Sequence, residues 1–140
     1  MAAQWALGRQ RSPLAALDRA AASLTRAIDL NPTEITGFEL GAELAEVRAS
    51  WLLRQGRDAS TAVAVGLEAV GRGLAINPRS GALLAHRGTL TWMSGRGAST
   101  PEARRDAATG AEHAWQQALA VNPLLAREIE PFRREASSCH

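Results

Sequence analysis

Three segments of the chain carry the same order of small and large apolar residues, and each ends in Asn-Pro. A small residue stands twelve positions before the proline, a large apolar residue eight before it, and another small residue five before it. These positions are Ala20, Leu24, Ala27 and Pro32, then Gly66, Val70, Gly73 and Pro78, and finally Ala111, Trp115, Ala118 and Pro123. Spacings of four and three residues put these side chains on one helical face, where small residues let a neighbouring helix come close. The pattern predicts three helices, each stopped by its Asn-Pro.

A further helix is expected after each of the first two Asn-Pro pairs. We place these helices at about 34–55 and 80–93. In the first of them, apolar residues at i, i+4, i+7 and i+11 predict the buried stripe, formed by Leu40, Leu44, Val47 and Trp51. Two further helix starts are predicted at Ser12-Pro13 and Thr100-Pro101, because each joins an N-cap residue to a proline at the first helical position.

The copies follow one another at a near-constant period, since Pro32, Pro78 and Pro123 are 46 and 45 residues apart. Such a period is typical of one supersecondary unit that is repeated and stacked. We therefore predict an all-α fold of about six helices, built as a right-handed stack of antiparallel helix pairs. The chain would form one domain over residues 1–140, with its units at 13–32 (a partial repeat), 33–78, 79–123 and 124–137 (a terminal capping helix).

Composition agrees with closely packed helices. Hydrophobic residues make up 46% of the chain and aromatic residues 4%, whereas strands favour aromatic and β-branched residues. The formal net charge is +2, and all 16 basic residues are arginine, which excludes catalysis through a lysine Schiff base. Acidic and basic residues are mixed along the chain, so we expect no nucleic-acid partner.

The chemistry-bearing residues are few. Cys139 is the single cysteine, which excludes an intramolecular disulfide and fits a reducing compartment. No apolar run approaches the ~20 residues that span a bilayer, so we expect a cytoplasmic protein without a membrane association. His86, His113 and His140 show no metal-ligand spacing, and we expect neither a metal nor a cofactor. His113 is predicted to lie on the surface.

The helix–turn–helix unit that ends in Asn-Pro resembles a tetratricopeptide repeat. The resemblance is carried best by the third copy, where Leu84, Gly88 and Gly95 fall at that family's first-helix anchor, close-packing glycine and turn glycine. The period of 45–46 residues exceeds the usual 34 of the family, so longer helices or loops are implied. The resemblance implies stacked helix pairs that present an extended surface to a protein or peptide partner.

A narrower resemblance is to the tetratricopeptide tails of some bacterial serine/threonine protein kinases. It rests on the stretch from Trp51 to Asp58 and on the ending Asn122-Pro123-Leu124-Leu125-Ala126-Arg127-Glu128. The kinase motifs themselves are missing, since there is no lysine and His86-Arg87-Gly88 lacks the catalytic aspartate. The resemblance implies a non-enzymatic scaffold in bacterial signalling, with the chain as the tail or relic of a longer protein.

Candidate partner contacts lie on the first helices of the pairs. Glu39, Glu43 and Glu46 share one helical face, and His86 and Trp92 belong to the next first helix. Carboxylates could recognise a basic peptide and tryptophan could anchor it. The alternatives are a merely solvated acidic face and a Trp92 that belongs to the core.

A structural role is the second hypothesis for the whole chain. Open ends of a helical stack favour further association, so the chain could assemble as a homodimer through such an end. Trp5, which precedes the first expected helix and could cover the exposed apolar end, and the half repeat at the start of the chain support this hypothesis.

Overall fold

The computed structural model describes residues 12–138, and this part of the chain consists of helices and short turns without a strand. Within residues 12–138, six α-helices and one 3-10 helix follow one another: α2 (Leu14–Leu30), α3 (Ile35–Arg54), α4 (Ser60–Ile76), α5 (Gly81–Arg96), α6 (Pro101–Val121), η1 (Pro123–Leu125) and α7 (Ala126–Ser138). The all-α class and the expected number of helices are confirmed. None of the described helices is long and apolar enough to cross a membrane.

Local sequence signals determine where the helices begin. The side chains of Ser80 and Thr100 accept hydrogen bonds from the backbone N–H groups of Leu83 (3.2 Å) and Ala103 (3.1 Å), and so cap α5 and α6. Pro101 takes the first position of α6, where its missing N–H costs no helical hydrogen bond. The predicted start at Thr100-Pro101 is therefore confirmed.

The three Asn-Pro pairs end helices as predicted. Asn31, Asn77 and Asn122 have φ values of −145°, −137° and −147°, outside the helical region. The following proline ring excludes the residue before it from helical geometry, which is why each helix stops at its asparagine. In α7, by contrast, the helix continues through Pro131.

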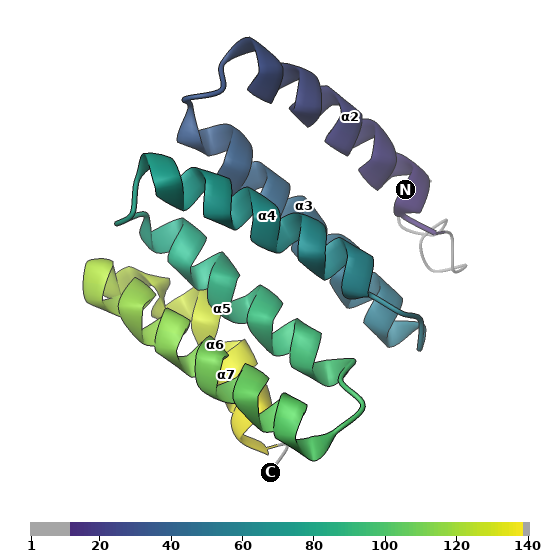
Figure 1. The fold of residues 1–140 in the computed structure, drawn as a ribbon, viewed down its shortest axis with the longest axis vertical. Coiled ribbons are helices and arrows are strands. Elements are labelled where there is room, and N and C mark those ends of the chain that lie inside the picture. The colour runs from purple at the N-terminus through teal and green to yellow at the C-terminus, as the bar shows by residue number, and fades with distance from the viewer. Residues whose placement is uncertain (1–11, 139–140) are drawn as a thin grey trace, which may run out of the picture.

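Consecutive helices run in opposite directions and lie side by side (Figure 1). Helix α3 contacts α4 and α5, and α5 contacts α4, α6 and α7. At one end of the described part, α2 contacts only α3. The helices α3, α5 and α7 thus touch in succession, and their common side carries the predicted partner contacts.

Close contacts between glycines and large side chains form the centre of the core. A Cβ atom at Gly88 would lie 2.3 Å from Cδ1 of Trp115, and one at Gly73 would lie 2.4 Å from Cδ1 of Leu83. A Cβ atom at Gly66 would lie 2.7 Å from Cβ of Ala45. The small positions of the second and third copies therefore let adjacent helices approach, since no larger side chain fits there.

The predicted core stripe of α3 is wrong. Leu40 and Val47 are 46% and 47% exposed, and Leu44 and Trp51 are half-buried. The buried face of α3 consists instead of Phe38, Ala42, Ala45 and Ala49. Small alanines face α4 and α5 because those helices come too close for leucine, and the larger residues are left on the other side.

The small positions of the first copy also differ from their counterparts. Gly66, Gly73, Ala111 and Ala118 are buried, whereas Ala20 and Ala27 are exposed. The physical reason is that α2 has one neighbour in the described structure, and Leu17 is its only fully buried residue.

Candidate partner-binding surface

The three predicted carboxylates lie on the side of α3 that borders α5. Glu39 and Glu46 are half-buried and Glu43 is exposed. Glu39 accepts a hydrogen bond from the hydroxyl of Ser80 (3.2 Å), the residue that caps α5. Since 41 residues separate the two partners, this bond fixes the start of α5 against α3. We call the side formed by Glu39, Glu43, Glu46 and Glu128 the acidic face.

Glu46 and His86 form the centre of the acidic face. Oε2 of Glu46 lies 2.5 Å from Nδ1 of His86, and each side chain is less than a fifth exposed. Burial raises the pKa of Glu46, and the hydrogen bond and charge of His86 only partly oppose this rise. Two predicted partner residues from different helices are thus brought together, and they bind each other.

The pKa of His86 responds to the same surroundings. Burial alone would lower it, but the hydrogen bond and charge of Glu46, together with the charges of Glu43 and Glu128, raise it. Glu128 lies on α7, so two helices, α3 and α7, contribute negative charge around an imidazole on a third helix, α5. The protonated histidine is therefore favoured in the folded protein.

Trp92 is not available at an open groove. It is 6% exposed, and its ring packs edge-on against Phe132 of α7, with ring centroids 5.8 Å apart. The guanidinium of Arg96 lies 5.3 Å from the centroid of the Trp92 ring. Because α7 covers this part of α5, the structure corrects the placement of Trp92 among the partner contacts and assigns it to the core.

The sequence also predicts whether one more tryptophan and one more histidine are buried or exposed. Trp115 is 1% exposed, as expected for a repeat core position, and its Nε1 donates a hydrogen bond to Thr89 (3.3 Å). His113 is exposed, as predicted. Trp5, Cys139 and His140 lie outside the described residues.

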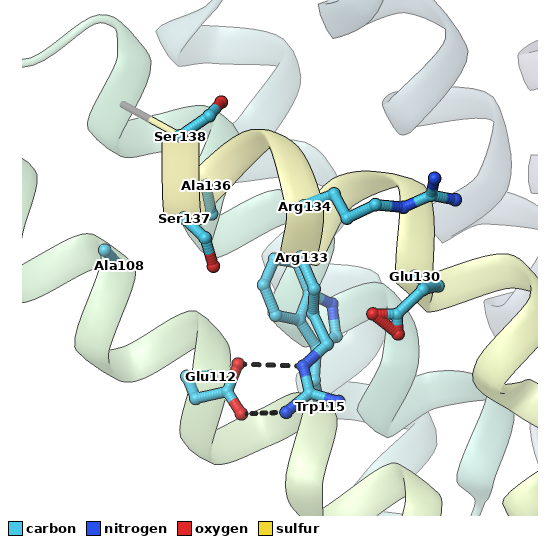
Figure 2. Close-up of a pocket in the computed structure, with 9 residues that line it drawn as sticks. All are labelled: Ala108, Glu112, Trp115, Glu130, Arg133, Arg134, Ala136, Ser137 and Ser138. Carbon is cyan, nitrogen blue, oxygen red and sulfur yellow. Dashed lines mark hydrogen bonds and ion pairs between the residues drawn. The ribbon is translucent and has the colours of Figure 1, made fainter. Parts of the chain in front are cut away.

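Sequence reasoning missed a hollow between α6 and α7. Figure 2 shows Glu112 of α6 accepting two hydrogen bonds from Arg133 of α7, at 3.0 Å (Nε) and 2.5 Å (Nη2), beside the buried Trp115. The bidentate bond to Glu112 raises the pKa of Arg133 further. With the two charges matched and partly exposed, this pair holds α7 against α6 rather than offering a reactive group. No local spacing could have shown it, because the partners are 21 residues apart.

A second hollow lies between α2 and α4 above α3. Its lining is mostly apolar and includes Leu17, Leu24, Phe38, Ala62 and Val65. Val65 is 57% exposed. An ion pair of 2.6 Å between Asp18 and Arg48 joins α2 to α3 beside it. No pattern in the sequence indicates this groove, since it depends on how far α2 lies from α4.

Within residues 12–138 no group of three or more His, Cys, Asp or Glu side chains is arranged to hold a metal ion. The groups that come together on the acidic face are carboxylates and one imidazole already bound to a carboxylate. Such an arrangement attracts positive charge.

Comparison with known proteins gives no relative from which a function could be transferred: no family model, curated protein or solved structure matches the chain at a significant level.

Proposed function

We propose that this chain is a non-catalytic, tetratricopeptide-like interaction module that binds a basic segment of a protein partner on its acidic face. Its units would be the repeats 13–32, 33–78 and 79–123 with the cap 124–137, arranged as a right-handed stack of antiparallel helix pairs. The succession of contacts from α3 to α5 to α7 supports this arrangement. By the resemblance to kinase tails, the module would serve cytoplasmic signalling in bacteria.

One observation carries the choice of surface. Carboxylates from α3 and α7 gather around His86, and Glu43 and Glu128 are close enough to raise the pKa of that imidazole. Both of these glutamates are exposed. A lysine or arginine of a partner segment would be attracted to them, and the attraction would weaken with salt.

Selection from a library of random peptides displayed on phage tests this proposal. We expect the selected peptides to be rich in lysine and arginine, and Glu43→Arg to weaken their binding at least tenfold. Glu68→Arg is the matched control, because Glu68 is an exposed glutamate on α4. Circular dichroism melts should show that neither change unfolds the protein. Apolar peptides that still bind the Glu43 variant but are lost on Val65→Asp would place the partner in the groove between α2 and α4 and refute the proposal.

A second candidate function is homodimerisation through the end of the fold at α2 and α3. The observation that favours it is the half-exposed pair Leu40 and Val47 on α3. Sedimentation velocity at several concentrations tests it, and a monomer throughout would leave only the interaction with another protein.

A further inference from the structure

His86 of α5 lies among carboxylates that belong to two other helices. Its Nδ1 is 2.5 Å from Oε2 of Glu46 on α3, and both side chains are less than a fifth exposed. Glu43 of α3 and Glu128 of α7 are exposed and close enough to act on the charge of the imidazole. Three carboxylates therefore share one counter-charge, and this charge is present only while both ring nitrogens carry a proton.

The other neighbours of α5 contact it through apolar groups. On α4, Gly66 meets the side chain of Leu90, and on α6 the indole of Trp115 meets Gly88. The 3-10 helix η1, which also contacts α5, has no charged residue. Within α5 itself, Arg87 follows the histidine directly, and consecutive residues of a helix do not face each other. The charges that act on the imidazole are thus the carboxylates of α3 and α7.

A cation of a partner segment would meet these same carboxylates. Glu43 and Glu128 supply the attraction to a basic segment in the function proposed above, so the present inference rests on that proposal. While His86 is protonated, its positive charge offsets part of this attraction and repels an approaching guanidinium. Once the proton is lost, the surface has one more unit of net negative charge and attracts the cation more strongly.

We propose that the proton on His86 and the basic partner segment compete for the carboxylates of the acidic face. The face then binds its partner less tightly when His86 is protonated, and partner binding releases protons. The two effects must be equal, because coupling between two ligands is reciprocal. A partner that favours the neutral imidazole therefore lowers the pKa of His86 by the same factor by which protonation weakens binding.

The test uses the full chain and an acetylated, amidated hexa-arginine peptide, whose charge does not change with pH. NMR titration of the His86 ring first locates the pH at which it loses its proton. The dissociation constant is then measured at low salt, once below the ordinary histidine value of 6.5 and once where His86 is neutral. We expect binding to be roughly threefold to tenfold tighter at the higher pH, as one unit charge acting across a partly exposed site allows.

His86→Gln and His113→Gln form a matched pair of variants. Glutamine is neutral at every pH and can still donate a hydrogen bond to Glu46. In His86→Gln the ratio of the two dissociation constants should fall to about one. His113→Gln, at an exposed position of α6, should keep the parent ratio. In the parent protein the peptide should also move the titration of His86 to lower pH, and this measurement needs no variant.

Three results would overturn the competition and leave the proposed function standing. The first is a ratio of one in the parent although Glu43→Arg abolishes binding, and the second is a parent-like ratio in a folded His86→Gln variant. The third is a titration of His86 that the bound peptide does not move. If hexa-arginine instead bound at neither pH, or bound Glu43→Arg as tightly as the parent, the proposed function would fail, and the competition with it.

Discussion

Replacing Gly88 by alanine tests the contact at the centre of the core. The added methyl carbon would meet the indole of Trp115 at 2.3 Å from Cδ1 and 2.4 Å from Nε1. A contact this short forces the ring to move, and Trp115 is 1% exposed. Movement of the ring would also stretch its 3.3 Å hydrogen bond to Thr89.

The expected change in the free energy of unfolding combines two destabilising contributions and one stabilising contribution. Overpacking costs up to ~3 kcal/mol, and loss of the hydrogen bond adds ~1 kcal/mol. Alanine in place of glycine within a helix returns ~1 kcal/mol. The net destabilisation of Gly88→Ala should be about 2–3 kcal/mol, which lowers the thermal midpoint by roughly 6–15 °C for a domain of this size.

The matched control is Gly71→Ala. Gly71 is also inside a helix, but it is exposed and an added Cβ would meet no atom within 4 Å. Only the gain in helix propensity remains there, so this variant should be more stable than the parent by up to ~1 kcal/mol. Urea unfolding followed at 222 nm measures both variants. If both substitutions stabilised the protein equally, the interlock of α5 with α6 would be refuted.

Three other predictions concern the core, the buried pair and the proposed absence of catalysis. Ala118→Leu should destabilise the fold by ~1–3 kcal/mol, because Ala118 is fully buried in α6. Ala120→Leu, at an exposed position of the same helix, should leave the urea midpoint nearly unchanged. Equal urea midpoints for the two variants would contradict the repeat alignment. Because the pKa of His86 is raised above its ordinary value of 6.5, the stabilisation by its protonated form is complete below about pH 6.5 and is lost as the pH rises through the raised value. The free energy of unfolding should thus fall as the pH rises above 6.5, and His86→Gln should flatten this fall. A parallel pH profile in the variant would disprove the assignment. Finally, calorimetry should detect no saturable, magnesium-dependent binding of ATP, since the chain has no lysine to hold phosphates.

The parts of the structure that the sequence predicted are those fixed by neighbouring residues. Thr100-Pro101 begins a helix and Asn77-Pro78 ends one through contacts within a few positions. These signals do not depend on the rest of the fold, so helix order and boundaries followed from them. The small residues of the second and third copies were also placed correctly, because a glycine inside a helix opposite a tryptophan serves mainly to make room for that ring.

The errors concern which side of a helix faces its neighbours. Helix α3 has two apolar stripes with the same spacing, one through Leu40 and Val47 and one through Ala42 and Ala45. Hydrophobicity favours the leucine stripe, whereas the distance between helices selects the alanine stripe, and that distance is a tertiary property. For the same reason the sequence does not decide between core and groove for Trp92, since the position of α7 determines it.

The sequence predicted which residues of α3 share the candidate surface, but not which residues they bind. Helical spacing put Glu39, Glu43 and Glu46 on one face, yet it could not show that Glu46 would bind His86 or that Glu39 would bind Ser80. The pair of Glu112 and Arg133 was missed altogether because it depends on where α7 crosses α6.

The order of helix contacts has a consequence for how the chain folds. In the described structure every contact between α-helices joins helices that are adjacent or next-but-one in the sequence. Folding therefore requires the closure of short loops only, and low contact order is typical of chains that fold within milliseconds. During synthesis, α3 and α4 could pack together before α7 leaves the ribosome, because neither contacts α7. The acidic face would be completed last, when α7 brings Glu128 to His86.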